Sequence, residues 1–146
     1  MAVIEQSIEI DRPPDEVYAY LEDLRRHAEW QEGLVVEEVN GDGGVGTHVK
    51  QRRRMGSREQ SVEWDVTEKD PPRSFAFRGT SGPLRPVGSG RLAPLDDGSR
   101  TQLTFSLDFE PHGIGYLLRP LARKQARNEI PRDHAKLKEI LESRRD

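Results

Sequence analysis

The chain is 146 residues long, has a formal net charge of −3 and contains no cysteine. This length is typical of one domain, and we expect residues 1–146 to form a single domain. The absence of cysteine excludes disulfide bridges, thiolate metal ligands and a cysteine nucleophile. The net charge gives no electrostatic reason to expect a nucleic acid or an anionic membrane as a partner.

No stretch of the chain has the pattern of a targeting signal or a membrane span. The first five residues, MAVIE, lack a basic region followed by an apolar one, and no apolar run approaches membrane-spanning length. We therefore expect a cytoplasmic protein without membrane insertion.

The chain opens with the pattern of a strand followed by a helix. Ile4, Ile8 and Ile10 share one parity and polar residues share the other, as in a half-buried strand. Two prolines and two acidic residues at 13–16 end the strand and favour the first turn of a helix. The apolar stripe of this helix is Val17, Tyr20, Leu21 and Leu24.

Beyond Trp30 the period of the apolar residues changes to two. Six strand candidates follow one another, Leu34–Val39, Thr47–Arg54, Glu59–Glu68, Ser74–Gly79, Leu84–Leu95 and Arg100–Glu110. Short turns of Gly, Pro and Asp join them, which predicts an antiparallel meander.

A type I′ turn at 97–98 would fix the register of the last hairpin. It places Gly90 opposite Phe105 and Gly88 opposite Leu107, all on the inward face. Two inward glycines leave either room for a partner or a gap that the opposite residues cover.

A turn at 55–58 would pair Lys50 with Glu63 on an outer, charged face. The same alternation turns Gln51 and Arg53 inward. Burial of an unpaired guanidinium is costly, so each of these two residues needs a partner, a water molecule or a ligand.

The last part of the chain, Gly113–Glu142, has a helical period and predicts a long helix that covers the sheet. Pro120 and Pro131 interrupt its pattern. Because an interior proline removes a backbone hydrogen bond, we expect a break or a kink near one of them.

Motifs along nearly the whole chain resemble one known family. They are Ser7-Ile8-Glu9-Ile10, Pro13-Pro14-Asp15-Glu16-Val17-Tyr18, Trp30, the loop Gly41–Gly46 and the ending Leu137-Lys138-Glu139-Ile140-Leu141-Glu142. The family they resemble is the polyketide cyclase/dehydrase branch of the START-like superfamily, which includes the birch-pollen allergen and lipid-transfer domains.

The resemblance implies an α+β, helix-grip fold. In this fold a curved antiparallel β-sheet wraps around a long C-terminal helix, and two short helices follow the first strand. It also implies a cavity between sheet and helix, often occupied by a hydrophobic small molecule. The family has no universal catalytic residue, so none is carried over.

Three local patterns resemble other kinds of site but lack the surrounding structure that those sites require. The G-x-G-x-x-G match at 41–46 leads into a strand instead of a helix, so we expect no dinucleotide cofactor. The basic run 51–54 faces acidic residues across the hairpin, which disfavours nucleic acid. The four histidines lack metal-ligand spacing, so no metal is expected.

We expect ligand contacts from inward aromatic, polar and glycine residues and from two leucines of the last helix. They are Trp30, Gln51, Arg53, Trp64, Phe75, Phe77, Gly88, Gly90, Phe105, Tyr116, Leu117 and Leu121.

The function that fits these expectations is binding of a hydrophobic or aromatic small molecule, such as a lipid or polyketide. One alternative is a cyclase/aromatase-type enzyme in which Arg53, Gln51 or Tyr116 assists proton transfer. A second alternative is an interaction module whose groove holds a peptide or a protein. In each case the chain is a monomer or a homodimer.

Overall fold

The computed structural model of the chain describes residues 4–55 and 57–143. Its elements, in chain order, are β1 (Ile4–Ile10), α1 (Pro14–Glu22), the 3₁₀ turn η1 (Leu24–Arg26), α2 (His27–Trp30), β2 (Leu34–Asn40), β3 (His48–Met55), β4 (Arg58–Asp70), β5 (Ser74–Gly79), β6 (Leu84–Leu95), the 3₁₀ turn η2 (Asp96–Gly98), β7 (Arg100–Pro111) and α3 (Gly115–Ser143). Every predicted strand is present, and its bounds differ from the prediction by two residues at most.

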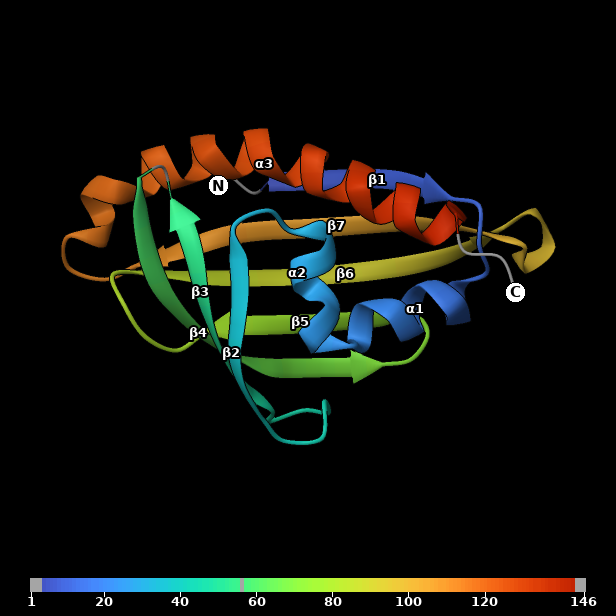
Figure 1. Cartoon of the computed structure of the whole chain (residues 1–146), viewed down its shortest axis with the longest axis horizontal. Coiled ribbons are helices and arrows are strands. Elements are labelled where there is room, and N and C mark those ends of the chain that lie inside the picture. The colour runs from blue at the N-terminus through green and yellow to red at the C-terminus, as the bar shows by residue number, and fades with distance from the viewer. Residues whose placement is uncertain (1–3, 56, 144–146) are drawn as a thin grey trace.

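The seven strands form one antiparallel sheet in the order β1-β7-β6-β5-β4-β3-β2. The sheet curves so strongly that β2 and β3 run across the direction of β6 and β7, while α3 lies along its concave side (Figure 1). This arrangement is the predicted helix-grip fold. No helix among the described residues is both long and apolar enough to cross a bilayer.

The register of the last hairpin is confirmed. Gly90 pairs with Phe105, as a two-residue turn requires. Asp97 and Gly98 both have positive φ, 61° and 90°, which is the backbone of a type I′ turn.

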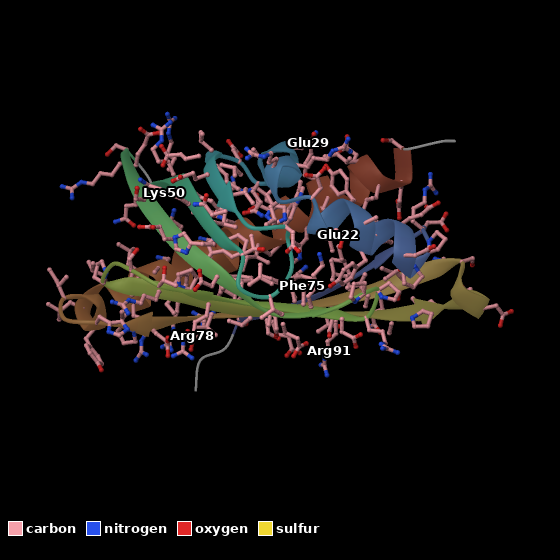
Figure 2. All side chains as sticks on the ribbon, turned by 90° about the horizontal axis from the view of Figure 1, so that it is seen from below. Glu22, Glu29, Lys50, Phe75, Arg78 and Arg91 are labelled. Carbon is pink, nitrogen blue, oxygen red and sulfur yellow. The ribbon has the colours of Figure 1, made fainter. Side chains whose placement is uncertain are left out.

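The register of the β3–β4 hairpin is confirmed as well. Lys50 lies opposite Glu63, and Arg54 lies opposite Glu59. In Figure 2, Arg78 and Arg91 point away from the concave side of the sheet, whereas Phe75 points toward it.

α3 runs without interruption through 115–143, all of which is described, so a break near a proline does not occur, and the alternative of a kink stays a prediction. Pro120 and Pro131 both lie on the exposed side of the helix. There, water can bind the carbonyl groups that lose their intrahelical partner, and the helix continues.

The main hydrophobic core fills one end of the grip, between α1, the β6–β7 hairpin and the last turns of α3. Its buried members are Ile10, Val17, Tyr18, Tyr20, Leu21, Leu92, Leu103, Leu137 and Leu141. Large side chains therefore close this end, and they leave the middle of the concave face less densely filled.

Candidate ligand-binding cavity

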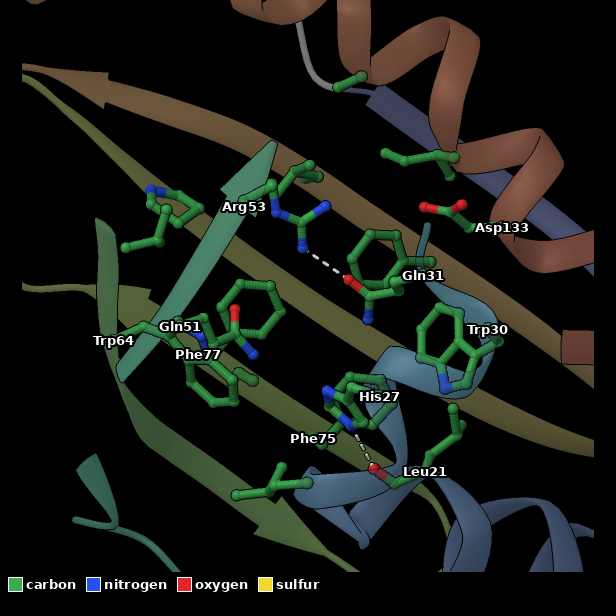
Figure 3. A pocket seen from close by; sticks show the side chains of 18 of the residues that line it. Leu21, His27, Trp30, Gln31, Gln51, Arg53, Trp64, Phe75, Phe77 and Asp133 are labelled. Carbon is green, nitrogen blue, oxygen red and sulfur yellow. Dashed lines mark hydrogen bonds between the residues drawn. The ribbon is translucent and has the colours of Figure 1, made fainter. Parts of the chain in front are cut away.

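A cavity of about 220 Å³ lies between the concave face of the sheet and α3 (Figure 3). Aromatic rings from five elements, α1, α2, β4, β5 and β7, form much of its wall. The rings of Trp64 and Phe77 have centroids 5.2 Å apart, and those of Phe77 and Phe105 are 6.3 Å apart. Contacts at these distances make a continuous aromatic surface.

The cavity exists because the inward residues of α3 become smaller toward its N-terminus. Leu137 and Leu141 fill the space between helix and sheet at the closed end. One and two turns before Ile130, the inward positions hold only Ala126 and Ala122, which line the cavity. A methyl group fills much less volume than a leucine side chain, so these turns leave open space above the middle of the sheet.

Seven of the twelve predicted contacts line the cavity. They are Trp30, Gln51, Arg53, Trp64, Phe75, Phe77 and Phe105. Their contact with a ligand stays a prediction.

Gly88 and Gly90 do not line the cavity, because aromatic rings cover them. A Cβ atom on Gly88 would overlap the ring of Phe77, and one on Gly90 would overlap the ring of Phe75. The glycines are therefore covered, which was one of the two alternatives, but the rings come from the directly paired positions of β5 and not from the opposite residues of β7. The prediction considered only the β6–β7 hairpin and so missed the neighbour on the other side.

Tyr116, Leu117 and Leu121 do not line the cavity either, and this part of the prediction is wrong. Their exposed fractions are 65%, 80% and 65%. The prediction assigned the larger apolar residues to the inner face of α3, but Ala122 and Ala126 occupy that face. The exposure of Tyr116 also removes it as a candidate for proton transfer inside the cavity.

Arg53 brings a guanidinium to the cavity wall, which also includes Lys69. Its Nη2 donates a hydrogen bond of 2.6 Å to Oε1 of Gln31, a neutral side chain that follows α2. Burial lowers the pKa of Arg53, and the negative charges of Asp133 and Glu129 oppose that effect. In Figure 3 the carboxylate of Asp133 faces Arg53 from α3, across the gap between helix and strand.

Asp133 is a weak acid in this setting. Burial raises its pKa to about 6, against the opposing effects of a hydrogen bond with the backbone of Glu32 and the charge of Arg53. The carboxyl group therefore changes its charge close to neutral pH, within the same cavity as a guanidinium.

His134 lies at the cavity wall and is only 3% exposed. Its ring packs edge-on against Phe105, at a centroid distance of 5.3 Å, and lies 6.0 Å from Trp30. Burial lowers the pKa of His134 to about 4, so the ring is neutral at pH 7. Neither its Nδ1 nor Nε1 of Trp30 has a hydrogen-bond partner among the described residues.

His27 is a further polar group of the wall. Its Nε2 lies 2.8 Å from the carbonyl oxygen of Leu21, which can only accept, so this nitrogen carries the proton. The ring stacks on Trp64 with an interplanar angle of 12°. Burial lowers the pKa of His27 and favours its neutral form.

The polar wall residues that sequence reasoning missed include His27, Gln31, Asp133 and His134. One signal was available for His134, because it continues the spacing of four that joins Ala126 to Ile130 on the inner face of α3. Asp133 and Gln31 have no comparable signal. Asp133 lies beside the buried stripe of α3, and Gln31 follows the end of α2.

The sequence of this chain matches a known protein family. A family model described as polyketide cyclase / dehydrase and lipid transport matches residues 1–142. The chain belongs to this family. No curated protein matches it.

Solved structures with the same fold include the Zhui aromatase/cyclase of a Streptomyces species, with a TM-score of 0.77 and 20% identity over 97% of this chain and 93% of that one. A protein of Thermus thermophilus superposes with a TM-score of 0.76 and 19% identity, over 96% of this chain and 97% of the other. The di-domain ARO/CYC BexL matches with a TM-score of 0.73 and 15% identity, over 99% of this chain and 51% of that protein. At these identities the likeness concerns the fold.

Proposed function

We propose that this protein binds a hydrophobic or aromatic small molecule, lipid-like or polyketide-like, that carries an anionic or hydrogen-bonding oxygen. The observation that carries the proposal is the aromatic-walled cavity with one guanidinium, Arg53, in its wall. A cytoplasmic location and a single domain are part of the same proposal.

The wall supports an apolar ligand body. Pockets for small molecules are lined mainly by apolar and aromatic groups, with a few polar groups that orient the ligand. Here the aromatic rings and the alanines of α3 supply much of the apolar surface, and Arg53, Gln51 and Gln31 are among the polar groups. The wall also includes acidic residues, Asp133 and Glu129 among them.

Arg53 supports an oxygen on that ligand. A guanidinium has five donors in a planar fork, suited to a carboxylate, phenolate or enolate. Its hydrogen bond to Gln31 uses one donor and leaves the positive charge without a carboxylate at hydrogen-bond distance among the described residues. A ligand oxygen would supply that negative charge.

The unpartnered nitrogens of Trp30 and His134 support the same ligand class. A buried polar group without a partner costs about 1–3 kcal/mol. Because both residues line the cavity, a hydroxyl or carbonyl group of the ligand would be favoured near them.

A cyclase-type enzyme is the second candidate, and Asp133 favours it. A carboxyl group with a pKa of about 6 is mostly ionised at pH 7 and can accept and release a proton there, whereas a pKa of about 4 makes His134 a weak base. Mass analysis of the ligand recovered after incubation separates the two functions, since a binder returns it unchanged and a cyclase returns a product that has lost water.

The test of the proposal is to fill the cavity from the helix side. Ala126→Phe would place a ring in the space beneath α3, so binding of the neutral fluorescent probe N-phenylnaphthylamine should fall by about tenfold or more. The matched control is Ala135→Phe on the exposed side of the same helix, which should bind like the parent. Fluorescence titration measures all three proteins.

Equal binding of the probe by both variants and the parent would contradict a ligand site in this cavity. Absence of probe binding to the parent, together with native mass spectra free of any co-purified small molecule, would favour the interaction module instead.

A further inference from the structure

We propose that the N-terminal end of α3 docks this protein on the surface of an anionic lipid membrane. The docking surface, called here the α3 tip patch, consists of Ile114, Tyr116, Leu117 and Leu121. Their exposed fractions are 61%, 65%, 80% and 65%. Four large apolar side chains exposed together on one short segment are unusual for the surface of a folded protein.

The patch has a definite position in the molecule. The first turns of α3 form one end of its long axis and project past the sheet (Figure 1). A projecting apolar end suits a flat, deformable partner such as a bilayer better than a second globular surface, which would need a matching hollow.

The patch is held in place by the neighbouring loop. The backbone N–H of His112 donates to the carbonyl oxygen of Pro83 at 2.8 Å. Gly115 is buried against the same carbonyl group, and a Cβ atom there would overlap it. The apolar side chains therefore keep one fixed direction, and docking does not first have to order them.

The charge beside the patch is complementary to an anionic surface. The stretch 112–128 contains no acidic residue and four cations, of which Arg123 is paired with Asp108 and Arg119, Lys124 and Arg127 supply the local excess of positive charge. The helical spacing of 3–4 residues places Lys124 on the stripe of Leu117 and Leu121. The acidic Asp108 before the helix is already bound by Arg123 at 2.9 Å.

These features are those of interfacial helices, in which apolar side chains enter the headgroup region and basic ones contact anionic lipids. The tyrosine fits the same position, since its ring is apolar and its hydroxyl stays wet. The net charge of −3, on which we based the expectation of no anionic membrane partner, averages over the whole chain and conceals this local excess of positive charge.

Docking would have a consequence for the cavity, which rests on the proposed function. The turns that carry Leu121 outward also carry Ala122 and Gln125 along the cavity wall. A ligand that partitions into lipid would then meet the protein next to its cavity. Docking itself needs no ligand, so the test below separates the two proposals.

The test is flotation with vesicles of three parts phosphatidylcholine and one part phosphatidylserine, compared with vesicles of phosphatidylcholine alone. The parent protein should float with the anionic vesicles, less with the neutral ones, and less again when salt rises from about 0.1 to about 0.5 M. The double variant Leu117→Ser/Leu121→Ser should lose about tenfold or more of the binding. Its matched control is Val45→Ser, which is 66% exposed in the loop between β2 and β3, on the side of the molecule away from α3.

A charge pair of variants tests the electrostatic half. Lys124→Glu/Arg127→Glu should weaken binding to the anionic vesicles by about tenfold or more, whereas Arg132→Glu/Lys136→Glu, further along the exposed side of α3, should have a clearly smaller effect. Failure of the parent to float, or unchanged flotation of the serine double variant, would overturn the proposal. Concentration-dependent dimers that the serine variant abolishes, without vesicle binding, would assign the patch to a second copy of the chain and would overturn it too.

Discussion

Replacing Trp64 with alanine should lower the free energy of unfolding by about 3–5 kcal/mol. Trp64 is 7% exposed and forms a buried cluster with Val49 and Val66, and its ring contacts Phe77 and stacks on His27. Its removal would leave a void next to the existing cavity and would separate β4 from α2.

Urea denaturation measures this loss, and Trp64→Phe is the conservative comparison. Phenylalanine keeps most of the ring contacts, so it should lose clearly less stability than alanine does. A loss below about 1 kcal/mol in the alanine variant would contradict a structural role and would make Trp64 only part of the cavity lining.

The neighbouring residues His134 and Asp133 should have opposite effects on the free energy of unfolding when the pH is lowered. The folded pKa of His134, about 4, lies below its ordinary value of 6.5, so the unfolded chain binds the proton more tightly and the fold loses stability as pH falls between these values. The shift corresponds to roughly 3 kcal/mol at pH 4. The folded pKa of Asp133, about 6, lies above its ordinary value of 3.8, so the fold gains stability over nearly the same interval.

Free energies of unfolding at pH 7 and at about pH 4.5 reveal both effects. His134→Leu removes the larger loss, so this variant should lose clearly less stability on acidification than the parent. Asp133→Asn removes the gain, so it should lose more. The exposed His112 provides the control His112→Gln, which should follow the parent. Parallel pH dependence in all four proteins would show that neither buried group has a shifted pKa.

The sheet could be predicted because the alternation of inward and outward side chains can be recognised within each strand and its neighbour. The paired charges Lys50 and Glu63, and the 97–98 turn, each specify a register, since a slip by one residue would exchange the two faces. Both registers, and with them the inward positions of Gln51 and Arg53, follow from pairs of neighbouring strands alone.

The helix side of the cavity could not be predicted in the same way. Hydrophobicity favours Leu117 and Leu121 as the inner residues of α3, yet the inner face holds Ala122 and Ala126. Large apolar side chains usually mark the buried face of a helix. Beside a cavity the buried face instead holds small side chains, because they leave space for the cavity. The role of Asp133 could not be predicted either, because its carboxyl group comes to face Arg53 only through the packing of α3 against the sheet.

The central claim is that Arg53 anchors an anionic oxygen inside an apolar cavity, and a matched pair of probes tests it most directly. Anilinonaphthalene sulfonate and N-phenylnaphthylamine share the same aromatic body, but only the first carries a permanent negative charge. Arg53→Met keeps the length of the side chain and removes the charge, and Arg54→Met on the exposed side of the same strand is the control. Affinity for the sulfonate should fall by about 1.5–3 kcal/mol in Arg53→Met alone, with little change for the neutral probe. Unchanged affinity for the sulfonate in Arg53→Met, or an equal loss for both probes, would contradict the anchor.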